Sequence, residues 1–149
     1  MTTTVQTAPT RPDDRTATGR RLRRAATLVA AAVAATIVWI VCVPVLGIDL
    51  TVNAGGAAEA VTLPSVIIVP ILTGGVAWAL LALFERMLRH GRRVWLIVAC
   101  VVLALALLEP LAMMASPAAL VSLLVLHFVT GVTLVTGLAL SARPAARSE

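Results

Sequence analysis

Four long apolar stretches, separated by short polar segments, dominate this chain of 149 residues. Each stretch is long enough to cross the hydrocarbon core of a bilayer, which takes about 20 helical residues. We place the four predicted spans at Ala25–Leu46, Ser65–Phe84, Val94–Met114 and Ala118–Leu140. The pattern therefore predicts an all-α membrane protein, in which four transmembrane helices form an antiparallel bundle.

The segment between the first two spans has a different pattern. Ile48, Leu50 and Val52 alternate with other residues, and Val61 and Leu63 alternate again after the turn-rich "NAGG". Alternation with a period of two is typical of strands. We therefore expect a small extracytoplasmic β-hairpin between helices 1 and 2. The hairpin should pack on the helix ends, because two strands alone are only marginally stable in water.

The other two connections are short. In "ASP", Ser116 can cap the fourth helix and Pro117 suits its first turn, so the third and fourth spans should be antiparallel neighbours. In "ERMLRHGRR", Glu85 and Arg89 have the spacing of a helix-end ion pair. Gly91 is a plausible residue to stop the second helix.

The charged residues predict how the chain is threaded. All twelve basic residues are arginines, and they lie before the first span, between the second and third spans, and after the fourth. Positive charge collects in cytoplasmic loops, so both termini are expected in the cytoplasm. The membrane is expected to be the bacterial inner membrane, which is the plasma membrane. The predicted organisation is a disordered basic tail over 1–24, a transmembrane domain over 25–140 and a short tail over 141–149.

The composition excludes some classes of protein. Hydrophobic residues make up 60% of the chain, against about 45–50% in soluble domains. The arginines flank apolar runs and form no single basic face, so nucleic acid is not an expected partner. Cys42 and Cys100 form no CxxC motif. Their predicted depths in the bilayer differ by more than about 10 Å, which is beyond the reach of a disulfide.

Small residues predict where the helices pack. Gly75 and Ala79 form a small-xxx-small pair in the second span, and Thr133 and Gly137 form another in the fourth. A helical wheel of the fourth span also separates a polar half from an apolar half. The half expected to face the bundle contains Ser122, His127, Thr130, Gly131, Thr133 and Gly137, and the half expected to face lipid contains Val121, Leu124, Val125, Phe128, Val132 and Val135.

The candidate functional residues are Glu109 and His127. Each lies sixteen residues from a flanking arginine, Arg93 or Arg143, and so about 24 Å from the arginine-rich boundary. A charge within the bilayer is costly, and a Glu–His pair lowers that cost. We hypothesise that the two meet across the hairpin of helices 3 and 4 as an intramembrane polar site. In the alternative, Glu109 reaches the outer surface, Pro110 only bends the helix, and His127 bonds a threonine or a backbone carbonyl.

Several segments resemble a known family. The segments are "VPVLGIDLTV", "GGVAWALLALFERML", "RRVWLIVACVVLALALLEPL" and "HFVTG". Over about residues 20 to 140, the chain resembles a family of small four-span membrane proteins from actinobacteria that is catalogued as a domain of unknown function. The resemblance implies no activity and no catalytic residues. The use of arginine without lysine also fits a high-GC actinobacterial source.

Three functions remain open from the sequence. The first is a non-enzymatic membrane protein that acts as a partner or accessory subunit, in contact with the lipid bilayer and with a possible homo-oligomer or membrane-protein partner. The second is a small proton-coupled transporter that uses Glu109 and His127. The third is a haem or redox protein that uses His127. No hydrolase or phosphate-binding motif is present in the sequence, so we expect no enzyme, no catalytic or metal-binding residue and no cofactor.

Overall fold

The computed structural model describes residues 12–54, 57–112 and 116–142 as four long helices and one small hairpin. The first helix, α1 (Pro12–Ile40), continues into a π-helical turn, η1 (Val41–Val45). Strands β1 (Thr51–Ala54) and β2 (Ala57–Ala60) follow. The other helices are α2 (Leu63–Met87), α3 (Gly91–Ala112) and α4 (Pro117–Ser141).

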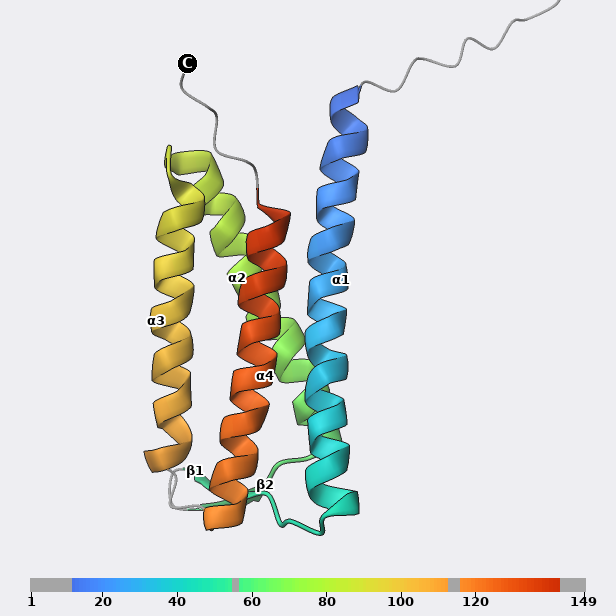
Figure 1. The fold of residues 1–149 in the computed structure, drawn as a ribbon, viewed down its shortest axis with the longest axis vertical. Helices are drawn as coiled ribbons and strands as arrows, with labels where there is room; N and C mark the ends of the chain where they lie inside the picture. Colours follow the sequence, from blue (N-terminus) through green and yellow to red (C-terminus); the bar gives the residue numbers. More distant parts are fainter. Residues whose placement is uncertain (1–11, 55–56, 113–115, 143–149) are drawn as a thin grey trace, which may run out of the picture.

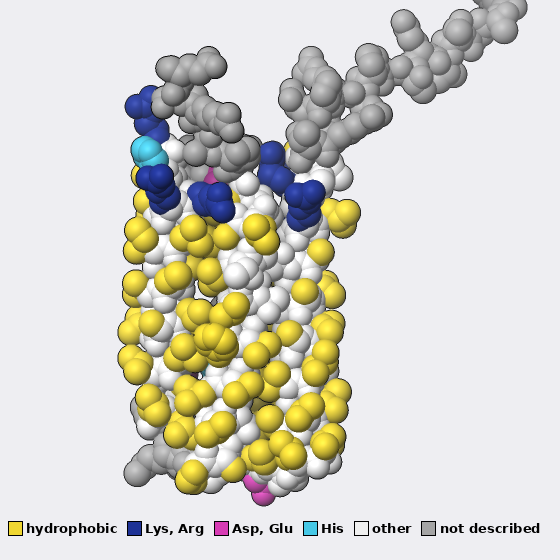
Figure 2. Space-filling model, in the orientation of Figure 1, with side chains coloured by type: hydrophobic (Ala, Val, Ile, Leu, Met, Phe, Trp, Pro, Cys, Tyr) yellow, Lys and Arg dark blue, Asp and Glu magenta, His cyan; other side chains and the backbone are white. Residues whose placement is uncertain are grey.

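The four helices form the predicted antiparallel bundle (Figure 1). Both α1 and α3 pack against α2 and α4. The four segments long and apolar enough to cross a membrane are Ala17–Val45, Leu63–Met87, Gly91–Leu111 and Pro117–Ser141, which confirms the four predicted spans. Figure 2 shows that the middle of the bundle is apolar on the face in view. That surface suits contact with the lipid bilayer.

The charged side chains visible in Figure 2 lie at the two ends of the bundle. One end, here called the arginine end, carries the arginines of α1 from Arg20 to Arg24 and those from Arg86 to Arg93 around the α2–α3 turn. The opposite end, here called the hairpin end, carries the exposed acidic residues Asp49 and Glu59. This separation places all the described arginines at one end of the spans, as the sequence predicts.

The β-hairpin lies at the hairpin end, between α1 and α2 in the sequence (Figure 1). Its strands pair antiparallel, with Thr51 opposite Ala60. Leu50, just before β1, is buried against Cys42, Ala119 and Leu123. The indole nitrogen of Trp39 donates a hydrogen bond of 2.9 Å to the carbonyl of Val61. The predicted hairpin is therefore confirmed, and side chains of α1, η1 and α4 hold it on the helix ends.

The helix α1 begins earlier than the first apolar stretch. Residues 12–24, which the sequence places in a disordered tail, are helical. One reason is that Arg24 is buried and donates from one guanidinium nitrogen to both carboxylate oxygens of Glu85, at 2.9 and 2.8 Å. This contact to α2 extends the ordered helix past the apolar run. Residues 1–11 and 143–149 lie outside the described part, so the predictions for them stay predictions.

The α2–α3 turn differs from its prediction. The helix α2 ends at Met87, so Arg89 lies beyond it, and Glu85 forms an ion pair with Arg24 of α1. Gly91 does not stop α2 but begins α3. A Cβ atom at Gly91 would collide with the carbonyl group of Phe84. Glycine is needed here because the start of α3 packs directly on the backbone of α2.

The small residues of α2 pack differently from the prediction. A Cβ atom on Gly75 would meet nothing within 4 Å, so Gly75 does not form the expected helix contact. The adjacent Gly74 does, since a Cβ there would lie 2.9 Å from side-chain atoms of both Leu28 and Leu134. Gly137 packs against Thr27, which gives α1 and α4 a close contact.

The predicted orientation of α4 holds in most positions. Ser122 and Thr130 are buried, whereas Val121, Val125 and Phe128 are exposed on the apolar half. One member of the lipid-facing set differs, because Val135 lines an internal cavity. The cap at Ser116 is as predicted, since its hydroxyl accepts a hydrogen bond from the Ala119 amide at 3.2 Å. Both cysteines, among the described residues, are free, as expected.

Candidate functional site

A cavity of about 500 Å³ lies between α2, α3 and α4, and the hairpin residues Val52 and Val61 line part of its wall. Small-molecule sites in proteins typically enclose about 300–1,000 Å³ and are mostly apolar with a few polar groups. This cavity has that character. Its apolar wall includes Val66, Val69, Pro70, Ala99, Val102, Leu103, Ala106, Leu126, Leu134 and Val135, and its polar side chains include Ser65, Thr73, Glu109, His127 and Thr130.

The arrangement of α2 explains why space remains there. In Figure 1, α2 runs obliquely behind α4, and its separation from α3 in this view grows toward the hairpin end. The tight Gly91 turn holds the two helices together at the arginine end. Trp95 is buried between them and donates a hydrogen bond of 3.0 Å to the carbonyl of Ala77. The two helices therefore form a wedge that is closed at the arginine end.

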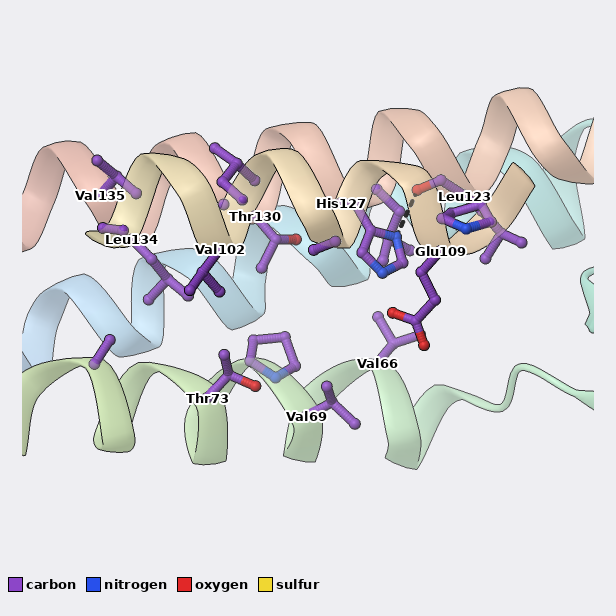
Figure 3. A pocket seen from close by; sticks show the side chains of 18 of the residues that line it. Val66, Val69, Thr73, Val102, Glu109, Leu123, His127, Thr130, Leu134 and Val135 are labelled. Atoms are coloured by element: carbon purple, nitrogen blue, oxygen red, sulfur yellow. Dashed lines mark hydrogen bonds between the residues drawn. The ribbon is translucent and has the colours of Figure 1, made fainter. Parts of the chain in front are cut away.

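Glu109 lies near the hairpin end of α3 and borders this cavity. Its side chain extends from α3 toward the α2 side of the cavity, near Val66 (Figure 3). No hydrogen bond or ion pair joins it to any residue that the structure describes. The next residue, Pro110, is buried and has no amide proton, so the carbonyl of Ala106 loses its helical donor. Ala106, Glu109 and Pro110 all border the cavity.

His127 borders the same cavity from α4. Its Nδ1 atom lies 2.8 Å from the carbonyl oxygen of Leu123 (Figure 3). A carbonyl can only accept, so Nδ1 carries the proton in this bond, and in a neutral ring Nε2 is then an acceptor. His127 thus bonds a backbone carbonyl, which is one of the two arrangements that the sequence predicts for it.

The structure brings Glu109 and His127 to one cavity without joining them. Among the described residues, neither a hydrogen bond nor an ion pair within 4.0 Å connects the two. They project toward the same part of the cavity from neighbouring helices (Figure 3). The two therefore form one polar region of the cavity wall, and a group placed between them could contact both. Direct pairing stays a hypothesis.

Thr130 is a third polar residue of the cavity. The sequence predicts only that it lies on the half of α4 that faces the bundle. It is 9% exposed, and its hydroxyl has no hydrogen-bond partner among the described residues. Other hydroxyls of α4 behave differently, since Ser122 and Thr133 each bond the carbonyl four residues earlier, at 2.9 and 2.7 Å. In Figure 3 the Thr130 hydroxyl projects into the cavity on the side of His127.

An unsatisfied buried hydroxyl costs about 1–3 kcal/mol, so this one calls for an explanation. Thr130 Oγ1 has almost no surface open to solvent, so a ligand or water in the cavity would become its partner only after a small shift of the neighbouring side chains. The only sequence signal for this role was its position three residues after His127 on the polar half of α4. Nothing in the sequence distinguished Thr130 from the hydroxyls that bond their own helix.

The cavity has no arrangement typical of a metal site. No group of three or more potential metal ligands occurs among residues 12–54, 57–112 and 116–142. The polar side chains that border the cavity from α3 and α4 are Glu109, His127 and Thr130, and Ser65 and Thr73 border it from α2. What this set can do chemically is accept and exchange hydrogen bonds with a guest in an apolar enclosure.

These observations define a small membrane protein built as a four-helix bundle with a cavity between its helices that opens to the surface, since the lining residues Val69 and Val102 are exposed. A family of unknown function (DUF6069) matches residues 15–144, and the chain belongs to that family. The match covers all four helices and the hairpin apart from the first residues of α1. No curated protein and no solved structure matches the chain.

Proposed function

We propose that this protein is a non-enzymatic integral membrane protein that binds a small amphiphilic molecule in the cavity between α2, α3 and α4. The observation that carries the proposal is the mostly apolar cavity of about 500 Å³, which Glu109, His127 and Thr130 border. The Thr130 hydroxyl is buried beside it and has no partner among the described residues. Glu109 and His127 add polar groups to the same wall. Such a protein could act alone, as a homo-oligomer or as an accessory to another membrane protein.

The proposed topology places both termini in the cytoplasm of a bacterial plasma membrane. It is supported by the collection of the described arginines at one end of the bundle (Figure 2). The hairpin end, with its cavity, would then face the outer leaflet. In a Cys42→Ala, Cys100→Ala background, Thr51→Cys should react with an impermeant maleimide on intact cells. Arg89→Cys should react only after permeabilisation, and the reverse result would overturn this topology.

The binding function can be tested by native mass spectrometry of protein extracted from its own membrane in a mild detergent. We expect a small-molecule adduct on the natural protein. Ala106→Phe should remove the adduct, because Ala106 lines the cavity and the larger ring would fill it. Ala104→Phe is a matched control, since Ala104 is exposed and does not line the cavity. Absence of an adduct, or equal adducts on both variants, would contradict the proposal.

A second candidate function is a proton-coupled carrier. It is favoured by one observation, that Glu109 and His127 border the same cavity. Ionisable residues within spans commonly belong to proton or substrate pathways. Proteoliposomes with a trapped pH dye should then show proton flux only when the substrate is present. If the ligand binds and no flux accompanies it, the protein is a binding protein and the carrier function is excluded.

A further inference from the structure

The polar end of the cavity offers acceptors to a guest. His127 uses its Nδ1 proton on the carbonyl of Leu123, which leaves Nε2 as an acceptor in the neutral ring. An ionised Glu109 has acceptor oxygens only. No other described side chain donates a hydrogen bond to either residue. Glu109 is exposed, so its carboxylate is open to a guest. A ligand that bonds both groups brings N–H or O–H donors, and a positive charge is favoured beside the carboxylate.

The rest of the cavity sets two further requirements. Its wall along α2 and α3 is made mainly of valine, alanine, leucine and proline side chains, so the body of the ligand must be apolar. Thr130 lies three residues after His127 on α4, and residues with this spacing have Cβ atoms about 5–6 Å apart. A second hydrogen-bonding atom of the ligand would therefore lie within a few ångströms of the first, and it would meet the unpartnered Thr130 hydroxyl after a small rotation of that side chain, because Oγ1 is nearly closed to solvent.

We propose that the cavity binds a lipophilic amine. A protonated primary or secondary amine lies between Glu109 and His127, the apolar body fills the space along α2 and α3, and a second polar atom of the ligand meets Thr130. The proposal rests on the proposed function, because it names the ligand class of the same cavity. In this arrangement the ammonium group of the ligand bonds the carboxylate of Glu109 and the imidazole of His127. The second polar atom of the ligand bonds the hydroxyl of Thr130.

Other amphiphile classes fit these groups less well. A fatty acid would bring a second carboxylate to Glu109, and two like charges repel strongly in a medium of low dielectric constant. A quinone offers only acceptor carbonyls, whereas His127 Nε2 and the Glu109 carboxylate are themselves acceptors. A quaternary ammonium supplies charge without an N–H group, so it leaves Nε2 unsatisfied. The amine is the class that matches both charge and hydrogen bonding.

The test uses the full chain in nanodiscs of zwitterionic phosphatidylcholine, with empty nanodiscs subtracted to remove partitioning into lipid. The probes are tritiated 4-amino-1-phenylbutan-1-ol, which carries an amine and a second polar atom, and 4-phenylbutylamine, which lacks the hydroxyl. Two competitors share the phenylbutyl body: trimethyl(4-phenylbutyl)ammonium and 5-phenylpentanoate. We expect the amino alcohol to bind most tightly, the simple amine next, the quaternary ammonium less tightly, and the carboxylate least.

Variants identify the residues that hold each group. Glu109→Gln should weaken binding of both amines by about tenfold or more, as expected for loss of a charge-assisted hydrogen bond. Thr130→Val should weaken the amino alcohol to the level of the simple amine, without affecting the simple amine. The matched controls are Glu59→Gln, which removes an exposed carboxylate of the hairpin, and Thr133→Val, which removes a hydroxyl bonded to the carbonyl of Val129. Both controls should bind like the natural protein.

The outcomes separate this inference from the proposed function. If no probe binds above empty nanodiscs, the cavity is not a binding site for such amphiphiles and both proposals fail. If the carboxylate binds as tightly as the amines, or if Glu109→Gln binds the amines as the natural protein does, the amine assignment fails and the binding function survives. Thr130→Val and the probe series do not depend on the folding of Glu109→Gln, so the inference stays testable if that variant misfolds.

Discussion

Two glutamates at opposite ends of the bundle have different surroundings. Glu85, at the arginine end of α2, is 9% exposed and accepts two hydrogen bonds from Arg24 of α1. Glu109, at the hairpin end of α3, borders a cavity and has no hydrogen bond or ion pair to any described residue. Sequence neighbours do not explain the difference, because both follow long apolar runs. The first carboxylate joins two helices, whereas the second is exposed and has no ion pair among the described residues.

The comparison suggests a division of roles between the two ends. At the arginine end, the Arg24–Glu85 pair, the Gly91 turn and buried Trp95 lock α1, α2 and α3 together. At the hairpin end, the wedge between α2 and α3 leaves a cavity that Glu109 and His127 border, and the buried hydroxyl of Thr130, near the middle of α4, has no partner among the described residues. Arg24 Nε at the arginine end is also buried without a partner among them. Stability is therefore expected to be concentrated at one end and binding at the other. Four substitutions test this division, and they are ordered from the largest expected effect to the smallest.

Arg24→Ala should have the largest effect on stability. It removes the cation that faces the buried Glu85 carboxylate, and breaking a buried pair in this way costs about 3–5 kcal/mol. The free energy of unfolding in bicelles would measure the loss. The double variant Arg24→Leu, Glu85→Leu should recover most of it, because it removes both charges. Arg23→Ala is the control, since Arg23 is exposed. A loss below about 1 kcal/mol for Arg24→Ala would contradict a structural role.

Gly91→Ala should be the next most damaging change. The added methyl group would collide with the Phe84 carbonyl, and overpacking of this kind costs about 1–3 kcal/mol. The same unfolding measurement applies, with Gly75→Ala as the matched control. A methyl group on Gly75 meets nothing within 4 Å, so that variant should be neutral or slightly more stable. If both variants behave alike, the arginine end is not held by this close contact.

Trp39→Phe tests how the hairpin is attached. It removes the hydrogen bond from the indole nitrogen to the Val61 carbonyl, which is worth about 1 kcal/mol. Amide exchange should therefore become faster at Val61, whose own amide donates to Leu50 at 2.8 Å. Exchange in α2 and α3 near the Gly91 turn should not change. Trp78→Phe serves as the control, because no hydrogen bond of its indole occurs among the described residues. Equal effects of the two changes would contradict this attachment.

Glu109→Gln should have the smallest effect on stability. No described residue depends on its charge, so the free energy of unfolding should stay within about 0.5 kcal/mol or increase. Glu85→Gln, the matched change at the other end, should lose more because it weakens the bond to Arg24. A loss above about 1 kcal/mol for Glu109→Gln would show that this carboxylate has a structural partner after all, and the comparison between the two ends would fail.

Much of the fold could be predicted because it depends on local pattern. The lengths of the four apolar runs located the helices, and the alternation before "NAGG" indicated the hairpin. The predicted second arm at Val61 and Leu63 was misplaced, because the second strand is Ala57–Ala60 and Leu63 begins α2. The wheel of α4 predicted that Ser122 and Thr130 face inward. Such patterns report which side of an element is buried. They do not report which partner an element meets. The small-residue pattern therefore predicted a helix contact at Gly75, whereas Gly74 makes it.

The sequence by itself determined the membrane class, the four spans, the hairpin and the concentration of arginines at one end, because hydrophobic length and charge act along the chain. Only the tertiary structure decided that Glu85 pairs with Arg24, 61 residues away, and that Glu109 and His127 share a cavity. It also decided that Thr130 lacks the bond that Thr133 makes. These facts depend on the relative tilt and rotation of whole helices, which packing sets and no local pattern encodes.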